Sequence, residues 1–561
     1  MGEIGQKDRK NPGLPKGRVT NPSTTQAVLE VLGQAPLRRD LLIEHLHRLQ
    51  DRFGHLSMSV LASLAQVMNL PMAELFEVAS FYAHFDIVAD GETPPPPTTL
   101  RLCGGPSCCM AGAAGLAEAA AEVLPKQVRL QLVPCIGRCD QAPAATVTKA
   151  AGGHLLVDRT TIDGLVAAAT QVPDKPMPLP ASVFAAYRQD GGYALLEACA
   201  AGKHSPEGII EILDQANLRG CGGAGFPTAQ KWRAVSRYEG PRLMVVNADE
   251  GEPGTFKDRH YLGSDPHRML EGMLIAAWAV DAEAIYIYLR DEYPDLRLRL
   301  LAEIAALEGA GLPLLRPIHL RRGAGAYICG EESGMIESIE GKRGLPRLRP
   351  PFVAERGLFG RPTLVNNVET LYWIRDMVEL GPAHFQGIGR RGRKGLRSFS
   401  VSGRIRSPGV KLAPAGISVR ELIDEFCGGM APGHRLQAYL PGGASGGIFS
   451  AEQADLPLDF GTFEPLGGFL GSAAVMVLSD HDDVKDFARQ LMDFFAHESC
   501  GQCTPCRLGT KKAAELLRRD HWDAALLGEL SRVMQDASIC GLGQAAPNAW
   551  ETVLRNFASE A

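Results

Sequence analysis

The stretch Glu498-Ser-Cys-Gly-Gln-Cys-Thr-Pro-Cys-Arg507 sets three cysteines two residues apart, and Cys540 follows in a later segment. Three thiolates at this spacing can hold one corner of an iron–sulfur cube while a fourth, distant thiolate closes it. A four-cysteine zinc site is the alternative, although such sites usually present two separated C-x2-C pairs. The spacing therefore favours a [4Fe–4S] cluster bound by Cys500, Cys503, Cys506 and Cys540.

A second set of cysteines lies nearer the N-terminus, as the pairs Cys103-x4-Cys108 and Cys135-x3-Cys139. Each pair falls at a turn of a predicted α/β unit, and two pairs suit the two irons of a [2Fe–2S] cluster. Zinc is again the alternative, and Cys109 could replace Cys108 because it follows directly. The two sets hold eight of the thirteen cysteines. Tight sets in a large intracellular chain indicate metal ligands rather than disulfides.

The length and composition of the chain describe a globular protein of several domains. Its 561 residues predict about three to four domains. A content of 45% hydrophobic and 22% charged residues excludes general disorder, and the net charge of −6 argues against a nucleic-acid partner. The best apolar run, 272–280, is far shorter than the ~20 residues of a membrane helix, and the basic N-terminus lacks a secretory signal. We expect a cytoplasmic protein with no membrane or nucleic-acid partner.

Helical and strand periodicity divides the chain into five units after an N-terminal tail. The predicted ranges are a flexible tail at 1–22, an N-terminal bundle of helices at 23–92, a small α/β unit at 98–172, a large α/β unit at 185–395, a mostly stranded unit at 397–478 and a C-terminal bundle of helices at 482–561. Proline-rich stretches at 94–97 and 173–180 form linkers. The aromatic run Phe81-Tyr-Ala-His-Phe85 is expected to lie in the last helix of the N-terminal bundle, as part of its core.

A glycine-rich loop, Gly220-Cys-Gly-Gly-Ala-Gly-Phe-Pro-Thr228, formally contains the G-x-G-x-x-G pattern of dinucleotide-binding proteins. That reading requires a preceding strand and an acidic residue about 20 positions later. Here a predicted helix at 206–216 precedes the loop, and Asp249 comes too late, so the pattern fails in context. The glycines still allow backbone N–H groups to face a phosphate, with Pro227 starting a helix and Lys231 supplying a cation.

Two further loops of the large α/β unit are acidic. The turn Gly323–Glu332 ends in the carboxylates Glu331 and Glu332, which would repel a phosphate but suit ribose hydroxyls or a carboxamide. The loop Asn247–Gly254 follows a predicted strand. An ordinary solvated turn is the alternative for each loop. Three such loops in a chain with two metal clusters nevertheless indicate a cofactor site.

These loops resemble those of the NADH-oxidising flavoprotein subunit of respiratory complex I. The resembling stretches are Leu218–Trp232, Asn247–Thr255, Gly323–Glu332, Pro362–Thr370 and Glu498–Arg507. Residues 24–170, including Glu77-Val-Ala-Ser-Phe-Tyr82, resemble the neighbouring thioredoxin-like [2Fe–2S] subunit, so two subunits are fused. The resemblance implies a multidomain α/β fold with an N-terminal helical bundle, a thioredoxin-like [2Fe–2S] domain, an FMN- and NAD-binding domain that is Rossmann-like but non-classical, a ubiquitin-like β-grasp domain and a C-terminal helical bundle with the [4Fe–4S] cluster.

The resemblance also implies which residues hold the cofactors. FMN would be held by Gly220, Gly222, Gly223, Lys231, Asn247, Asp249, Glu250, Tyr327, Gly330, Val365, Asn366, Asn367 and Thr370. NAD would stack on Phe226 and Phe352, with Glu252, Glu331, Glu332 and Arg349 nearby. Glu252 and Glu332 are the catalytic candidates and would orient the nucleotide, because hydride transfer moves no proton to the protein. Cys221, Ala234 and Arg349 depart from the family's usual arginine, aromatic residue and lysine.

Fused chains of this kind are similar to the β subunit of cytosolic NAD-dependent formate dehydrogenases. They are also similar to the diaphorase subunit of NAD-linked hydrogenases, and a complex I-like NADH dehydrogenase module is a further alternative. The complete [2Fe–2S] cysteine set and the stretch Arg39-Asp-Leu-Leu-Ile-Glu-His-Leu-His47 favour formate dehydrogenase. The implied partner is a catalytic α subunit with a molybdenum or tungsten pterin and further Fe–S clusters. A scaffold that has lost its flavin is the rival from another class, and the intact loops and cysteines speak against it.

Overall fold

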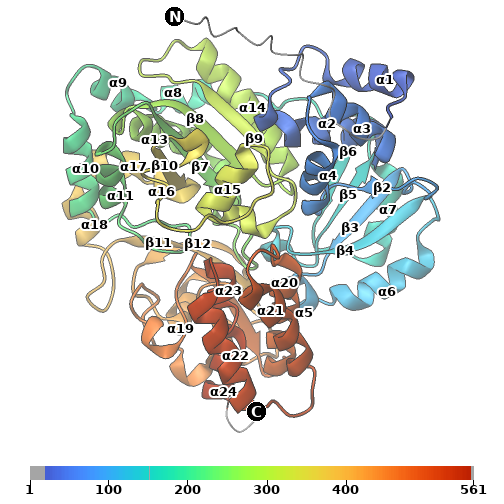
Figure 1. Ribbon diagram of the computed structural model, residues 1–561. Helices are drawn as coiled ribbons and strands as arrows, with labels where there is room; N and C mark the ends of the chain where they lie inside the picture. The colour runs from blue at the N-terminus through green and yellow to red at the C-terminus, as the bar shows by residue number, and fades with distance from the viewer. Residues whose placement is uncertain (1–18, 151, 558–561) are drawn as a thin grey trace, which may run out of the picture.

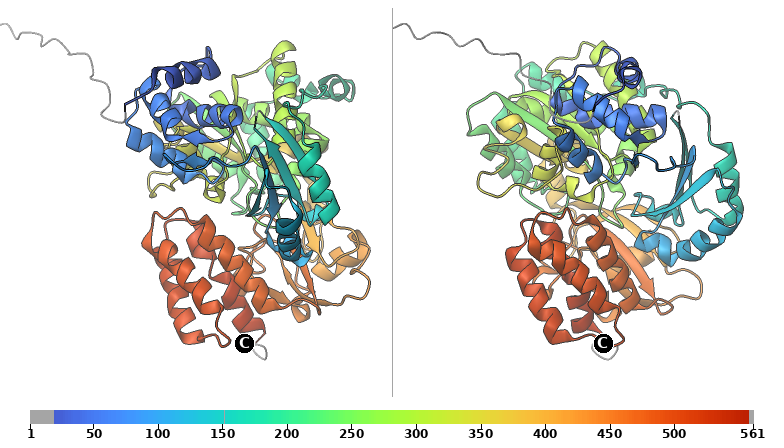
Figure 2. Two further views of the ribbon diagram at one scale, coloured as in Figure 1. Left: turned by 90° about the vertical axis from the view of Figure 1, so that its right-hand side faces the viewer. Right: turned by 45° about the vertical axis from the view of Figure 1, so that its right-hand side comes forward.

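The computed structural model describes residues 19–150 and 152–557, with the large α/β unit beside the two N-terminal units and the C-terminal helices below them (Figure 1). Two further views show the C-terminal helices below the large α/β unit, with the stranded unit beside them (Figure 2). Residues 1–18 of the predicted tail lie outside the described residues, and helix α1 (Pro22–Leu32) begins at the last residue of that tail. In the described part of the chain, no helix has the length and apolar content needed to cross a membrane.

The N-terminal bundle consists of four helices and one short pair of parallel strands. They are α1, α2 (Leu42–Phe53), α3 (Met58–Val67), α4 (Met72–Phe81), β1 (Leu56–Ser57) and β2 (Ile87–Val88). The prediction for the aromatic run is wrong in one respect, because α4 ends at Phe81 and the remaining aromatics follow it. The hydroxyl of Tyr82 donates to the carbonyl of Lys342 at 2.7 Å and lies 2.9 Å from Ser338 Oγ, both in the large α/β unit. These aromatics join two units, which helical periodicity within one unit cannot show.

The small α/β unit is a four-stranded sheet in the order β4-β3-β5-β6. Its elements are β3 (Thr98–Cys103), α5 (Pro106–Met110), α6 (Ala113–Val123), β4 (Val128–Val133), β5 (Ala145–Lys149), β6 (Gly153–Val157) and α7 (Ile162–Gln171). Strands β3 and β4 are parallel, whereas β5 and β6 are antiparallel to their neighbours. Leu100 and Leu102 of β3 are fully buried, which explains why this strand is central.

The large α/β unit is built on a fully parallel sheet in the order β10-β7-β8-β9. Its strands are β7 (Arg242–Ala248), β8 (Ala282–Leu289), β9 (Ile318–Arg322) and β10 (Thr363–Asn367). Its helices are α8 (Phe184–Gln189), α9 (Ala194–Ala200), α10 (Pro206–Gln215), α11 (Thr228–Ser236), α12 (Lys257–Ser264), α13 (Pro266–Ala279), α14 (Pro294–Gly309), α15 (Glu332–Ile339), α16 (Val368–Tyr372), α17 (Ile374–Leu380) and α18 (Pro382–Gln386). Buried runs such as Met244–Val246 are typical of parallel strands covered on both faces.

The stranded unit is a mixed five-stranded sheet in the order β12-β11-β15-β13-β14. Its elements are β11 (Leu396–Gly403), β12 (Gly409–Pro414), α19 (Val419–Glu421) with a π turn over Leu422–Phe426, β13 (Leu436–Leu440), β14 (Phe449–Ser450) and β15 (Ala474–Ser479). Strands β11 and β15, which come first and last in the chain order of this unit, are parallel and adjacent, and the β11–β12 hairpin forms one edge of the sheet. A single helix covering a mixed sheet agrees with the expected β-grasp domain.

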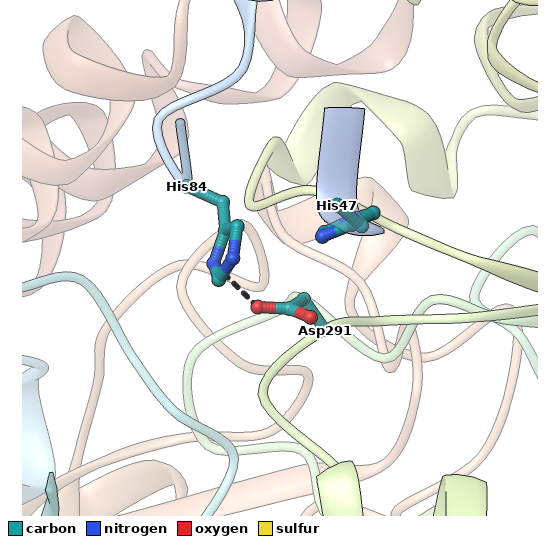
Figure 3. Close-up of side chains that lie close together, drawn as sticks. All are labelled: His47, His84 and Asp291. Atoms are coloured by element: carbon teal, nitrogen blue, oxygen red, sulfur yellow. Dashed lines mark ion pairs between the residues drawn. The ribbon is translucent and has the colours of Figure 1, made fainter. Parts of the chain in front are cut away.

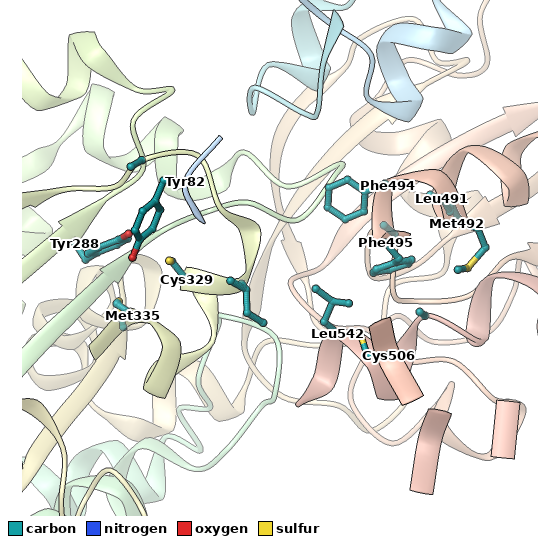
Figure 4. Packing of buried hydrophobic residues seen from close by; sticks show 14 of the residues in the cluster. Tyr82, Tyr288, Cys329, Met335, Leu491, Met492, Phe494, Phe495, Cys506 and Leu542 are labelled. Carbon is teal, nitrogen blue, oxygen red and sulfur yellow. The ribbon is translucent and has the colours of Figure 1, made fainter. Parts of the chain in front are cut away.

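The C-terminal bundle shares its hydrophobic core with the large α/β unit and the N-terminal bundle. Its helices are α20 (Val484–Glu498), α21 (Thr504–Leu517), α22 (Ala524–Ala537), α23 (Gly541–Ala545) and α24 (Asn548–Asn556). Tyr82 packs beside Tyr288 and Cys329, and the same cluster of buried side chains continues to Phe495 and Leu542 (Figure 4). The chain is therefore a multidomain α/β protein in which the N-terminal bundle, the large α/β unit and the C-terminal bundle meet in one shared hydrophobic cluster.

Candidate functional site

One edge of the parallel sheet gathers the predicted cofactor loops. Adjacent parallel strands bring their carboxyl ends together, and ligands of open α/β sheets bind outside that edge. Loops begin at residues 249, 290 and 323 after β7, β8 and β9, whereas α16 follows β10 directly at residue 368. All three loops that the sequence singles out lie at or beside this edge.

The glycine-rich loop joins α10 to α11 and packs closely against the end of β10. The N–H of Cys221 donates to Thr370 Oγ1 at 2.9 Å, and that of Gly220 donates to the carbonyl of Phe226 at 2.9 Å. A Cβ on Gly222 would lie 3.2 Å from Asn367 Cβ, so a side chain there would press on β10. The structure confirms that a helix, and not a strand, precedes this loop.

Lys231 on α11 is the cation beside the loop. Its Nζ donates to Glu332 Oε2 and to the carbonyl of Val365, both at 3.1 Å. Burial alone would raise the pKa of Glu332, but Lys231 and Arg349 outweigh it and lower that pKa. Three predicted residues from separate segments therefore meet here, where one ammonium group joins Glu332 to the carbonyl of Val365 on β10.

Asp249 follows β7 and carries an unsatisfied buried oxygen. Its Oδ2 has no hydrogen-bond partner, while its backbone N–H donates to Asn247 Oδ1 at 3.0 Å. Burial raises the pKa of Asp249 to about 8. A buried acceptor without a partner costs free energy unless a ligand satisfies it, so this oxygen fits a hydrogen-bond donor of a cofactor.

Some predicted FMN-binding side chains are engaged by the protein itself. The Glu250 carboxylate accepts from the N–H groups of Asp258 and Arg259 at 2.8 and 3.0 Å, and burial and the Asp258 charge raise its pKa to about 7. Asn366 Oδ1 accepts from the indole of Trp232 at 2.9 Å. Asn367 caps α16 and hydrogen-bonds Asp258. These side chains hold the loops in place around the strand ends.

Glu252 links the sheet edge to the stranded unit. Its carboxylate accepts from the Tyr327 hydroxyl and from the Ser445 backbone N–H, the latter at 2.8 Å. Burial raises the pKa of Glu252 and outweighs these hydrogen bonds, which act to lower it. Tyr327 in turn donates its N–H to Glu498 Oε2 at 3.0 Å, next to the [4Fe–4S] cysteine motif.

The predicted NAD residues lie at the outer side of the same edge. Phe226 and Phe352 are 51% and 56% exposed, so their rings remain available for stacking. Glu331 caps α15 and pairs with Arg349, which also lies 3.2 Å from Glu332. Two glycines predicted to bind FMN also lie in these loops. The carbonyl of Gly330 accepts a hydrogen bond from Asn247 Nδ2 at 2.9 Å, and Gly223 adopts a φ of +133°, a conformation that favours glycine.

The four C-terminal cysteines converge on one small cavity. Cys500, Cys503, Cys506 and Cys540 line it together with Ile328 and Leu542. Burial raises the pKa of Cys506 to about 11 and that of Cys540 to about 12, so these sulfurs need a cationic partner to become thiolates. The four thiols and their apolar surroundings fit the expected [4Fe–4S] cluster.

The four N-terminal cysteines also converge, and all are buried. Cys103 ends β3 and contacts the sulfurs of Cys108 and Cys135, and Cys135 Sγ lies 3.3 Å from Cys139 Sγ. The alternative ligand Cys109 points elsewhere, since its thiol donates to the carbonyl of Gly104 at 3.2 Å. Four converging thiols fit a [2Fe–2S] cluster with Cys108 in place of Cys109.

Sequence reasoning assigned no role of their own to Arg290, Glu498 and Ser445. Arg290 is buried and donates to the carbonyls of Cys135, at 2.7 Å, and of Glu250. It thereby joins the [2Fe–2S] cysteines to the loop after β7. Arg290 directly follows β8, and its place at the carboxyl end of a strand was the one available signal. Nothing local marks Ser445, whose contact with Glu252 spans 193 residues.

Comparison with known proteins agrees with this geometry. Residues 213–376 match the Nuo51 FMN-binding domain, residues 486–561 the NADH-ubiquinone oxidoreductase-F iron–sulfur binding region, and residues 28–168 the thioredoxin-like [2Fe–2S] ferredoxin. The second F-type subunit of NADH-quinone oxidoreductase from Rhizobium meliloti (strain 1021) is 40% identical over 395 residues, which are 67% of this chain and 93% of the relative. The NADP-reducing hydrogenase subunit HndC of Solidesulfovibrio fructosivorans is 38% identical over 373 residues, covering 64% of this chain and 76% of the relative.

A solved structure matches nearly the whole chain. The crystal structure of an NAD+-reducing [NiFe]-hydrogenase in the H2-reduced state has a chain that is 32% identical, with a TM-score of 0.80. The match covers 94% of this chain and 93% of that one. The expected FMN, [4Fe–4S] and [2Fe–2S] domains are all confirmed. The chain therefore belongs to the family of F-type subunits of NADH-quinone oxidoreductase, NAD-dependent flavin and iron–sulfur oxidoreductases, here with a thioredoxin-like [2Fe–2S] domain in the same polypeptide.

Proposed function

We propose that this chain is the NAD-binding diaphorase subunit of an NAD-dependent formate dehydrogenase. The observation that carries the proposal is that one chain brings together the nucleotide loops and two converging cysteine sets, the C-terminal set in the core shared with the N-terminal bundle and the N-terminal set in its own buried clusters. The stretch Arg39–His47, which favours formate dehydrogenase, is built into the same assembly. Its Asp40 pairs with Arg321 of β9 at 2.8 Å.

In this proposal the loops at the sheet edge bind FMN. Backbone N–H groups of the loop at 220–223 and the ammonium group of Lys231 hold the phosphate. Asn247 and Asp249 contact the flavin from the end of β7. Bound FMN supplies the exchange between hydride pairs and single electrons.

The exposed rings of Phe226 and Phe352 stack on NAD, while the carboxylates beside them orient it. Glu332 is kept ionised by Lys231 and Arg349 and accepts hydrogen bonds from ribose hydroxyls or the carboxamide. Glu252 is fixed by Tyr327 and Ser445 and acts in the same way. Neither carboxylate needs to accept a proton, because hydride transfer moves none to the protein.

The partner in this proposal is a catalytic α subunit with a molybdenum or tungsten pterin and further Fe–S clusters, in the cytoplasm. The second candidate is the diaphorase subunit of an NAD-reducing hydrogenase. It is favoured by the 94% coverage of this chain by a hydrogenase structure. A complex I-like NADH dehydrogenase module is supported by the NADH-quinone oxidoreductase relatives.

Purification of the native complex distinguishes these candidates. We expect the complex to contain molybdenum or tungsten, to lack nickel, and to reduce NAD+ with formate. Nickel together with hydrogen-dependent NAD+ reduction would replace the proposal by the hydrogenase candidate. A purified chain without flavin or Fe–S absorption bands, unable to reduce a dye with NADH, would instead indicate a scaffold.

A further inference from the structure

Three potential metal ligands, none of them a cysteine, meet between the N-terminal bundle and the large α/β unit (Figure 3). His47 lies on α2, His84 follows α4, and Asp291 follows β8. One ligand atom from each residue lies within 4.8 Å of the other two. Nothing in the electron-transfer chemistry above uses this group.

His47 presents a buried lone pair without a partner. Its Nε2 lies 2.8 Å from the carbonyl oxygen of Gly323, and a carbonyl can only accept, so Nε2 carries the proton. In the neutral ring Nδ1 is then an acceptor, and it has no hydrogen-bond partner although His47 is only 2% exposed. Metal-binding histidines characteristically donate their other N–H to a carbonyl or carboxylate in this way.

Asp291 supplies the negative charge of the group. Its Oδ2 lies 2.5 Å from His84 Nδ1, and its Oδ1 accepts from Arg322 Nε at 2.5 Å. Arg322 also pairs with Asp51 at 2.7 Å, so two carboxylates face one guanidinium. Arg322 holds the Asp291 carboxylate in position as an outer hydrogen-bond partner, and this carboxylate also interacts electrostatically with the guanidinium groups of Arg101 and Arg297.

The geometry suits a small divalent ion after a modest adjustment. Bonds of about 2.0–2.1 Å to a tetrahedral zinc ion place the ligand atoms about 3.3 Å apart. The ion would replace the proton between His84 and Asp291 and separate them slightly, while the His47 ring moves closer. His84 and Asp291 also line a cavity of about 730 Å³ between the units, which offers an entry path and room for a water ligand.

We propose that His47, His84 and Asp291 bind one divalent transition-metal ion of the zinc type, which links the N-terminal bundle to the large α/β unit. Two imidazoles and one carboxylate form a ligand set that proteins use for zinc and for iron(II). With three ligands from the protein, the fourth position is open to the cavity. The ion holds together segments that are more than 200 residues apart in the sequence.

The test measures zinc binding by the full-length holoprotein, with its FMN and Fe–S clusters loaded under anaerobic conditions. Zn2+ is titrated against a chromophoric chelator, and zinc X-ray absorption then identifies the ligand atoms. His47→Gln is the main variant, because the glutamine amide can still donate to Gly323 while Nδ1 is removed. Asp291→Asn keeps an acceptor for Arg322 but removes the charge. His45→Gln is the matched control, since His45 is also a buried histidine of α2 with an unpartnered Nδ1 but lies outside the group.

We expect one zinc ion per chain, bound by nitrogen and oxygen atoms only, in the unmodified protein and in His45→Gln. The dissociation constant should rise at least about tenfold in His47→Gln and in Asp291→Asn at unchanged FMN and iron content. Sulfur in the zinc shell would place the ion at the cysteines and overturn the proposal. It would also be overturned if the unmodified protein bound no stoichiometric zinc, or if His47→Gln bound zinc as tightly as the control.

Discussion

Replacement of Lys231 by methionine tests the phosphate site most directly. Methionine keeps most of the length and apolar volume of the lysine stem, so packing on α11 is retained. What is lost is the ammonium group, which lies 3.1 Å from both Glu332 Oε2 and the carbonyl of Val365. The variant therefore removes one charge from the edge of the sheet and leaves Glu332 paired with Arg349 alone.

The expected loss of FMN affinity follows from the strength of one charged hydrogen bond. A hydrogen bond to a charged group contributes about 1.5–3 kcal/mol, and 1.4 kcal/mol corresponds to a tenfold change in a dissociation constant. Loss of the ammonium–phosphate contact should thus weaken FMN binding roughly 10- to 100-fold. Because the Lys231 side chain is 30% exposed, solvent screening places the expected value in the lower half of this range.

The assay titrates deflavinated protein with FMN and measures the fluorescence of the FMN that remains free, which gives the dissociation constant. Lys512→Met is the control, since Lys512 is an exposed lysine on α21 that pairs with Glu515. Iron content reports whether the clusters and the fold survive deflavination. If Lys231→Met and Lys512→Met bound FMN equally well, the assignment of Lys231 to the phosphate would be refuted.

Three further predictions address the contact of Tyr82 with the large α/β unit, the buried carboxyl group of Asp249 and the [4Fe–4S] ligand Cys506. Tyr82→Phe removes the hydroxyl that contacts Ser338 and Lys342 and should lower the free energy of unfolding by about 1–3 kcal/mol. Denaturant titration measures this change, with Tyr238→Phe at an exposed tyrosine as the control. Equal effects of the two variants would contradict the prediction. Burial raises the Asp249 pKa from its ordinary value of 3.8 to about 8, so the folded chain holds a proton that the unfolded chain releases, and stability falls as pH rises between these values. Asp249→Asn should reduce this fall in thermal melts between pH 5 and pH 8, and an unchanged pH dependence would count against it. Cys506→Ser should retain FMN and NADH-dependent dye reduction but lower partner-linked turnover, and normal turnover would remove Cys506 from the electron path.

The sequence was most informative where function is encoded by local spacing. The short intervals within Cys500–Cys506, Cys103–Cys108 and Cys135–Cys139 indicated both cysteine sets, because ligands of one cluster often come from adjacent turns. The prediction that a helix, and not a strand, precedes Gly220 also came from a short stretch of sequence, and the structure confirms α10 there. Strands β7 and β8 of the large α/β unit were recognisable as apolar runs, and the structure confirms both.

The sequence was least informative where distant segments meet. The role of Tyr82 depends on Lys342, and that of Ser445 depends on Glu252, so no local window contains either contact. Glu250 was singled out as an FMN residue, whereas its carboxylate accepts from the backbone at the start of α12. Such a carboxylate looks the same in the sequence whether it faces a ligand or its own backbone.

The hydrophobic core drawn in Figure 4 has a consequence for electron flow. Because the N-terminal bundle, the large α/β unit and the C-terminal bundle share buried side chains, relative motion of these units would expose apolar surface to water. The cofactor loops of the large α/β unit and the [4Fe–4S] cysteines are accordingly held at a constant separation, and electron transfer between them need not wait for a hinge to close. Cutting the polypeptide between these units should yield fragments that aggregate through their exposed apolar surface and do not fold as independent domains.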